Sequence, residues 1–296
     1  MSIACSIGIF AHNEAANITA LLEAVSTQKL DIVTIEEIIV VSSASTDGTD
    51  DLVRDYAVIN PLVKLETQAR REGKASAINL FLQKARADIL IVISADVIPE
   101  ADTIEKLGAA FTDPDIGATG GRPMPVNAQT SFMGYAVHLL WRLHHRMALK
   151  APKLGEMIAF RKIMQSIPPD SAVDEASIEA LIKAGGYKLR YIPDALIRNK
   201  GPQTLRDFVK QRRRIQNGHL WLKQNQHYEV VSQQNSTLTR VLCEELKDNP
   251  FDLLKIAAVV LLEVYCRMLG SIDYYVLGKN PFAWDIARST KNLAVK

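Results

Sequence analysis

Short apolar runs alternate with amphipathic segments along the first hundred residues. Runs rich in β-branched residues predict buried strands at residues 6–10, 38–41, 63–67 and 89–93. Helical spacing of the apolar positions predicts helices at residues 16–27, 50–56 and 74–85. This alternation predicts an α/β fold with a mostly parallel sheet that helices cover on both faces. In such sheets ligands gather at the carboxyl ends of the strands.

The second half of the chain is less regular. It predicts a strand and turn at residues 117–125, helices at 132–149, 174–184 and 205–223, and a short strand at 189–192. The most apolar stretch is 251–277, but Lys255, Glu263, Arg267 and Asp273 interrupt it, so a free-standing transmembrane span of about 20 apolar residues is not supported. Two of them, Glu263 and Arg267, can pair on one helical face. We expect an amphipathic helix that lies in the membrane interface or packs against a partner, with a core helix of a soluble domain as the alternative.

Composition excludes some classes of protein. The net charge of +2 argues against a nucleic-acid binder driven by bulk electrostatics. Basic charge is local: from Arg198 to Lys223 there are eight Lys or Arg residues and one Asp. This segment indicates a site for phosphate or for an anionic surface.

The cysteines and the N-terminus indicate a cytoplasmic protein. Cys5, Cys243 and Cys266 are too few and too scattered for a disulfide framework or a zinc site, so buried thiols in a reducing compartment are expected. The first five residues lack the pattern of a signal peptide. The histidines near residue 140 have no carboxylate or cysteine at a metal-binding spacing, which favours an interfacial or surface helix there.

Candidate polar residues follow the predicted strands. His12, Ser42, Ser43 and Asp96 all fall at strand ends, where a parallel sheet binds ligands. Asp96 comes directly after the run 89–93 and could hold a divalent cation with phosphate oxygens. A helix-capping or turn aspartate is the alternative.

Lys74 opens a predicted helix after Gly73, and a helix N-terminus is a natural place for phosphate. A solvated helix start is the alternative. The phosphate-binding loop of nucleotide hydrolases is absent, because Gly73-Lys74 lacks the upstream glycine and the following Ser or Thr.

Two further motifs could supply a catalytic base and a cation that binds a diphosphate. Asp174 and Glu175 begin a predicted helix and could deprotonate an acceptor hydroxyl, or could merely complement the helix dipole. Three consecutive arginines fan around another helix, so only one, most plausibly Arg214, could clamp a diphosphate. Arg212 and Arg213 would then meet solvent or anionic lipid, and a merely solvated basic face is the alternative.

Taken in order, these motifs resemble the family 2 glycosyltransferases, which have the GT-A nucleotide-diphospho-sugar transferase fold. The resemblance covers roughly residues 3–225 and rests on segments 7–14, 40–49, 71–79, 94–96, 174–175 and 211–215. It implies that Asp96 binds Mg²⁺ or Mn²⁺ and that Glu175, with Asp174 beside it, is the base. It also implies a donor site made of Ala11, His12, Glu14, Ser42, Ser43, Arg71, Lys74, Ala95, Gln211 and Arg214.

The chain departs from the family pattern at four places. Ser42-Ser43 replaces the acidic pair of the nucleoside turn, and Ser94 replaces the first Asp of the metal motif, which leaves Asp96 as the obvious carboxylate ligand. The base pair is transposed to Asp174-Glu175. Ile215 replaces Trp, which weakens the case for a processive polymer synthase.

The resemblance implies an inverting glycosyltransferase with a catalytic domain at residues 1–225 and a helical, membrane- or partner-associated region at 226–296. Its donor would be a nucleotide sugar, its acceptor a hydroxyl that lipid could carry, and its place the inner face of the membrane. Two alternatives stay open: a nucleotidyltransferase, and a catalytically silent relative that binds nucleotide sugar or serves as a scaffold.

Overall fold

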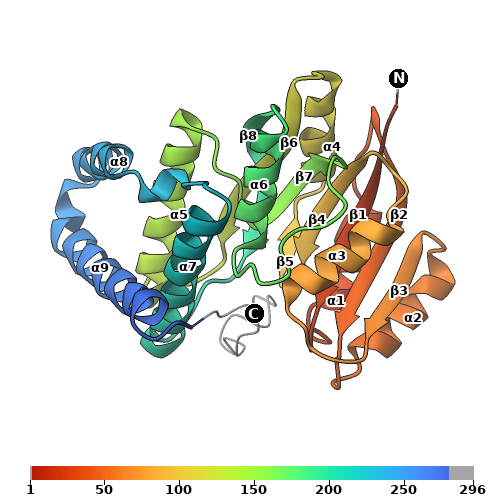
Figure 1. Ribbon diagram of the computed structural model, residues 1–296, viewed down its shortest axis with the longest axis horizontal. Helices are drawn as coiled ribbons and strands as arrows, with labels where there is room; N and C mark the ends of the chain where they lie inside the picture. Colours follow the sequence, from red (N-terminus) through yellow and green to blue (C-terminus); the bar gives the residue numbers. More distant parts are fainter. Residues whose placement is uncertain (1, 280–296) are drawn as a thin grey trace.

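The computed structural model describes residues 2–279, and within them eight strands form one sheet (Figure 1). The order is β3-β2-β1-β4-β7-β6-β8-β5. The first four strands are parallel, β7 is antiparallel to β4 and β6, β8 is parallel to β6, and β5 is antiparallel to β8. The strands are β1 (Ile3–Ala11), β2 (Val33–Ser43), β3 (Val63–Gln68), β4 (Ile89–Ser94), β5 (Val97–Pro99), β6 (Ile116–Pro125), β7 (Met157–Arg161) and β8 (Lys188–Asn199).

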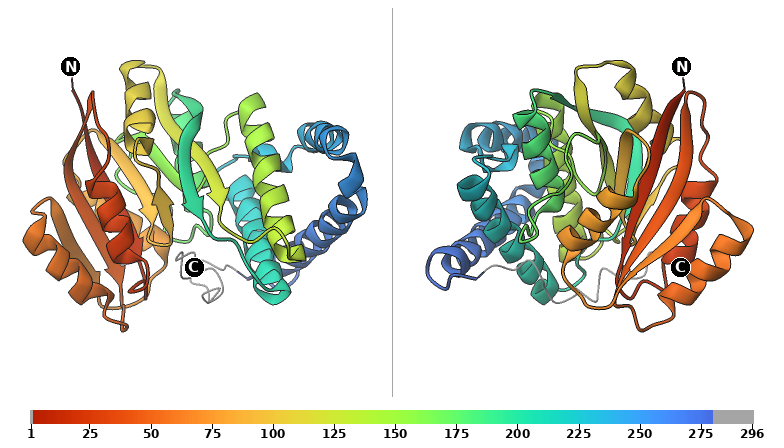
Figure 2. Two further views of the ribbon diagram at one scale, coloured as in Figure 1. Left: turned by 180° about the vertical axis from the view of Figure 1, so that it is seen from behind. Right: turned by 45° about the vertical axis from the view of Figure 1, so that its right-hand side comes forward.

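Helices cover both faces of the sheet, as the sequence predicts (Figure 2). They are α1 (Ile18–Ser26), α2 (Thr49–Ile59), α3 (Lys74–Lys84), α4 (Thr103–Ala109), α5 (Phe132–Lys150), α6 (Asp174–Ala184), α7 (Leu205–Asn225), α8 (Asn235–Asp248) and α9 (Leu253–Tyr275). Alternate residues of a strand point to opposite faces. Ile91 and Ile93 of β4 therefore pack with α1 and α4, whereas Leu90 and Val92 pack with α3 and α6.

The predicted strands and helices are confirmed, but four elements were not predicted. These are β5, β7, α4 and α8. β5 has three residues, and β7 has five and owes its burial to its place between β4 and β6. Segments so short show too little periodicity for a prediction.

A second layer of helices stands beside the β6–β8 part of the sheet. Figures 1 and 2 show α5, α7, α8 and α9 gathered on this side of the molecule. Their apolar side chains form one core, which includes Leu139, Phe208, Val241, Ile256 and Val259. Residues on both sides of position 225 share this core, and the domain boundary there stays a prediction. Residues 280–296 of the predicted C-terminal region lie outside the described residues.

α9 is amphipathic, as predicted, and the pair Glu263–Arg267 forms at 3.1 Å. Within residues 2–279, none of the helices combines the length and the apolar character needed to cross a bilayer. The three cysteines are free thiols, but the expectation that all are buried is wrong, because Cys243 is exposed on α8.

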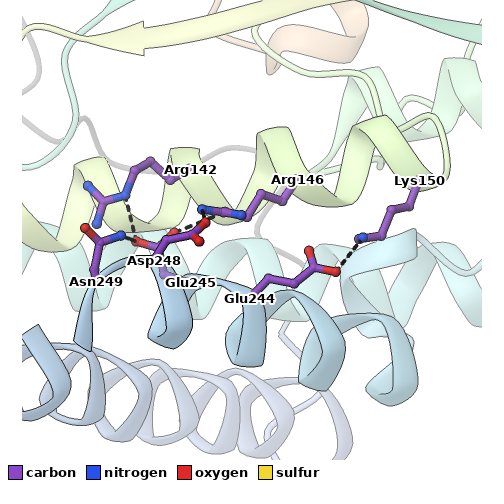
Figure 3. Close-up of polar contacts among 7 residues, drawn as sticks. All are labelled: Arg142, Arg146, Lys150, Glu244, Glu245, Asp248 and Asn249. Carbon is purple, nitrogen blue, oxygen red and sulfur yellow. Dashed lines mark hydrogen bonds and ion pairs between the residues drawn. The ribbon is translucent and has the colours of Figure 1, made fainter.

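Ion pairs and hydrogen bonds between charged side chains link α8 to α5 (Figure 3). The carboxylate of Glu245 is fully buried and accepts hydrogen bonds from Arg142 Nε at 2.8 Å, Arg146 Nε at 3.2 Å and Asn249 Nδ2 at 3.0 Å. Arg146 also reaches Asp248 at 2.5 Å. The more exposed pair Lys150–Glu244 lies on the same interface at 2.7 Å.

We expect Glu245→Gln to destabilise the protein strongly, because it leaves the partly buried guanidinium of Arg142 without its anion and leaves Arg146 with Asp248 alone. Breaking a buried pair in this way costs about 3–5 kcal/mol. Glu244→Gln is the matched control and should cost under about 1 kcal/mol, since both side chains of its pair are about one-third exposed. Denaturant unfolding followed by circular dichroism measures both, and equal stabilities of the two variants would contradict the assignment.

Candidate functional site

The carboxyl ends of β1, β2 and β4 open into one cavity of about 1360 Å³. Parallel pairing brings these strand ends to the same edge of the sheet. The starts of α3 and α6 and the middle of α7 complete the lining. Most sequence-predicted site residues lie there: Ala11, His12, Glu14, Ser43, Arg71, Lys74, Ala95, Asp96, Asp174, Glu175, Gln211 and Arg214. Ser42 does not contribute to the lining, because its side chain is fully buried and its hydroxyl donates to Ser45 Oγ at 2.8 Å.

The loops after β1 and β2 are tied together at one end of the cavity. His12 Nδ1 donates to the carbonyl of Ser43 at 2.6 Å, and the amide of Thr46 donates to Asn13 Oδ1 at 2.8 Å. Asn13 has a left-handed backbone, with φ of 54°, which asparagine tolerates better than most residues. These bonds hold polar groups of both loops at the cavity wall, a suitable arrangement for a nucleoside.

An ion pair joins the starts of α3 and α6. Lys74 Nζ donates to Glu175 Oε1 at 2.5 Å, and the side chains are 19% and 26% exposed. Burial alone would lower the pKa of Lys74, but the charges of Glu175 and Asp174 outweigh it and raise this pKa. Lys74 is therefore a cation at a helix N-terminus, where anions bind.

The pKa values of the two neighbouring carboxyl groups of α6 are shifted in opposite directions. Burial raises the pKa of Asp174 to about 7, with a contribution from the charge of Glu175. Burial acts on Glu175 in the same sense, but Lys74 outweighs it and holds the pKa of Glu175 below its usual value. Divergent pKa values of adjacent carboxyl groups are a feature of acid–base sites. Glu175 is the member exposed to the cavity, since Asp174 is 2% exposed.

Glu156 is a cavity residue that the sequence analysis missed. It directly precedes β7 and accepts a hydrogen bond from Asn199 Nδ2 at 3.3 Å. Burial, followed by the charges of Asp96 and Glu175, raises the pKa of Glu156 to about 7. Its φ is 27°, a strained value for a residue with a side chain. In the sequence, Gly155 and Glu156 precede an apolar run, which is a weak local signal of a strand end. Glu156 lies at the cavity because β7, which was not predicted, begins directly after it.

Arg214 faces the acidic end of the cavity. Burial lowers its pKa to about 10, while Asp174, Glu175, Glu156 and Asp96 all act in the opposite sense, so the guanidinium stays charged at neutral pH. The expectation that Arg212 and Arg213 meet solvent or lipid is wrong. Arg212 binds Glu263 of α9 in a bidentate pair at 2.8 and 2.6 Å, and Arg213 pairs with Asp273. These bonds fix α7 against α9 and so orient Arg214.

The other end of the cavity is apolar. Its walls come from α5, α8 and α9 and include Leu140, Met147, Leu238, Leu242, Val259 and Val260. Lys153 also lines the cavity, half-buried, and has no hydrogen bond or ion pair with the residues that the structure describes. Burial and the charge of Arg212 lower its pKa to about 8, against the opposing charges of Glu179 and Glu263. His144 of α5 is buried as well.

The acidic end has the chemistry of a site for a hard divalent cation. Asp96 follows β4 and lines the cavity, and carboxylate oxygens are the ligands that Mg²⁺ and Mn²⁺ prefer. Among residues 2–279, no group of three or more His, Cys, Asp or Glu side chains is placed to hold a metal by itself. Such a set is not needed where phosphate oxygens complete the coordination.

Comparison with known proteins identifies the family. Residues 6–169 match the family model described as glycosyl transferase family 2, which is more than half of the chain. The protein therefore belongs to glycosyl transferase family 2.

Two curated relatives are similar to parts of the chain. Poly-beta-1,6-N-acetyl-D-glucosamine synthase of Staphylococcus aureus is 26% identical over 198 residues, which are 62% of this chain and 48% of that protein. Dolichyl-phosphate beta-glucosyltransferase ALG5C of Trichomonas vaginalis is 32% identical over 71 residues, 24% of this chain and 21% of that protein. The chain thus spans about half the length of the synthase and less of the second relative.

A solved structure is similar over almost the whole chain. It is the mannosyltransferase PcManGT of Pyrobaculum calidifontis in complex with GDP-Man and Mn²⁺, with a TM-score of 0.59 and 24% identity. The likeness covers 95% of this chain and 82% of that chain. It shows that the chain has the GT-A fold.

Proposed function

We propose that this protein is an inverting glycosyltransferase that moves a sugar from a nucleotide-sugar donor to an acceptor hydroxyl. The observation that carries the proposal is the shared cavity of Asp96, Glu175 and Arg214, which come from the turn after β4, from α6 and from α7. Family membership and the GDP-Man held by the mannosyltransferase of similar fold also support a nucleotide-sugar donor.

Each charged group has a place in this reaction. His12 and Ser43 would hold the nucleoside between the loops after β1 and β2, and Lys74 would meet the phosphates at the start of α3. A divalent cation held by Asp96 would neutralise the negative charge that develops on the departing diphosphate. Arg214 would stabilise the same charge from α7.

Glu175 is proposed as the general base for a single displacement, which inverts the sugar carbon. Its ion pair with Lys74 suggests how donor binding would increase the basicity of Glu175. Donor phosphates that bind Lys74 would compete for its ammonium and release the carboxylate. Because Lys74 holds the pKa of Glu175 down, this release raises the pKa and makes the carboxylate a stronger base.

We expect Glu175→Gln to lower turnover by about 100-fold or more without weakening donor binding, because the proton acceptor is lost while Lys74 loses only a competitor of the donor phosphates. Purified protein, Mn²⁺ and a panel of nucleotide sugars are used, with product release and anomeric configuration followed by NMR. Glu229→Gln, on an exposed pair with Lys223, is the control and should keep full activity.

Three results would contradict this proposal. Full turnover of Glu175→Gln would remove the base assignment, with Asp174→Asn as the next variant. Release of pyrophosphate instead of a nucleoside diphosphate would indicate the nucleotidyltransferase alternative. Nucleotide binding without turnover of any donor would indicate a silent relative.

We further propose an acceptor that is linked to lipid through phosphate. The apolar end of the cavity suits an acyl or isoprenoid chain, and Lys153 supplies a cation for an anionic head group. The name of the dolichyl-phosphate glucosyltransferase relative is consistent with this chemistry. Burial of Lys153 would strengthen its attraction for a phosphate.

Lys153→Met should weaken the binding of dodecyl phosphate, a soluble lipid-phosphate analogue, by about 10-fold, roughly 1.4 kcal/mol. Because the pKa of Lys153 is lowered to about 8, wild-type binding should also weaken as the pH rises through 8 and the ammonium loses its proton. Isothermal titration calorimetry measures both effects, with dodecyl maltoside as the neutral control. Equal affinity of wild type and variant would overturn the assignment.

The exposed face of α9 is proposed to rest on the inner surface of the membrane. Leu254, Leu261, Tyr265 and Met268 recur at helical spacing and are all exposed. Lys255 and Lys279 lie near the two ends of the helix, where they could meet anionic head groups.

The variant Leu254→Gln/Leu261→Gln/Met268→Gln should lose most of its flotation with vesicles of phosphatidylglycerol and phosphatidylcholine, because the apolar contact area is removed. Val58→Gln/Ile59→Gln on α2 is the matched control, since it replaces exposed apolar residues elsewhere. If both variants float equally well, α9 does not contact the membrane.

A further inference from the structure

Glu156 and Ser94 lie next to the same end of the β4–β7 ladder. The two strands are antiparallel and pair Ile89 with Arg161 at one end and Ile93 with Met157 at the other. Ser94 follows Ile93 as the last residue of β4, Glu156 directly precedes Met157, and both residues line the cavity. Ser94 is the residue that stands where the family's metal motif has its first aspartate.

The pleat of the sheet sets the direction of Ser94. Ile93 belongs to the core on the α1 and α4 side. Its neighbour Val92 belongs to the core on the α3 and α6 side. Because side chains alternate along strands, Ser94 turns toward the α3 and α6 side. Glu156 precedes β7 with a φ of 27°, so a turn of the backbone, and not the pleat, brings it to the cavity that Ser94 and Asp96 line.

Glu156 is poorly accounted for as a structural residue. Its one side-chain hydrogen bond, from Asn199, is long at 3.3 Å, and its backbone is held at φ of 27°. Salt bridges of Glu156 are absent among the described residues, although Lys74 and Arg214 line the same cavity. Glu156 thus combines a strained backbone with a half-buried carboxylate that has one long hydrogen bond. Such a residue is unusual unless a ligand provides further contacts to the carboxylate.

We propose that Glu156 supplies the carboxylate that Ser94 lacks, so that Asp96 and Glu156 together hold the divalent cation on a nucleoside diphosphate. Two carboxylates plus phosphate oxygens form an ordinary site for Mg²⁺ or Mn²⁺. The carboxylate that the metal motif lacks at Ser94 is thus supplied by the residue before β7 instead of by β4. This inference rests on the proposed function, because the cation is expected with the nucleotide.

Binding of Mn²⁺ in the presence of GDP or UDP, followed by electron paramagnetic resonance, tests the proposal without an acceptor or turnover. Glu156→Gln should weaken Mn²⁺ binding by about 10-fold, or roughly 1.4 kcal/mol. Asp96→Asn should weaken it at least as much. Glu179→Gln is the matched control, because Glu179 is a buried carboxyl group of the same cavity that instead binds Leu154 and Tyr228, and it should leave the affinity within about twofold.

A second substitution tests the geometry. In the Glu156→Gln background, Ser94→Asp returns a carboxylate to the opposite strand and should restore most of the lost Mn²⁺ affinity. Thermal unfolding checks that every variant folds. Failure of this rescue would overturn the claim that Glu156 takes the place of the missing aspartate.

The remaining outcomes separate the inference from the proposed function. If Mn²⁺ binding depends on Asp96 and not on Glu156, the inference fails and the proposed function stands. If the wild type with either nucleotide binds no Mn²⁺, the proposed function loses its cation and the inference falls with it.

Discussion

The charge balance inside one half-buried cavity governs the site. Asp96, Glu156, Asp174 and Glu175 converge there from three different elements, and Lys74 and Arg214 offset them. Like charges at short range cannot all ionise without cations between them. Burial therefore raises the pKa of Asp174 and of Glu156 to about 7, while the Lys74 ion pair keeps Glu175 ionised. This balance is the basis of the proposal that the ligand brings both phosphate and a cation.

The helical layer holds the cationic side of this balance in place. Buried or partly buried carboxylates on α8 and α9 bind arginines of α5 and α7: Glu245 with Arg142 and Arg146, Glu263 with Arg212, and Asp273 with Arg213. Arg214 follows directly after two arginines that are locked in this way. Residues beyond position 225 thus help to orient a side chain of the cavity and also form its apolar end. The acidic end and the apolar end are parts of one continuous cavity.

Much of this arrangement could be predicted from local pattern. Parallel strands were recognisable from continuous apolar runs, and ligand residues were expected where those runs end. His12, Ser43 and Asp96 meet at the cavity because parallel pairing aligns strand ends. Lys74, Asp174 and Glu175 were recognisable because a helix start is itself a local signal, carried by glycine or by acidic residues.

The remaining features depend on contacts between segments far apart in the chain. Glu156 reaches the site through β7, whose pairing with β4 spans more than sixty residues, and no periodicity in five residues announces it. Arg212 and Arg213 looked solvated because their partners Glu263 and Asp273 lie two helices later. Lys153 gives no local signal at all, since only the packing of the helices brings it to the cavity that residues of α5, α8 and α9 also line. Residue type and spacing therefore specify which chemistry is present, whereas strand register and helix packing decide which charged groups share a cavity, because electrostatic interaction depends on distance in space and not along the chain.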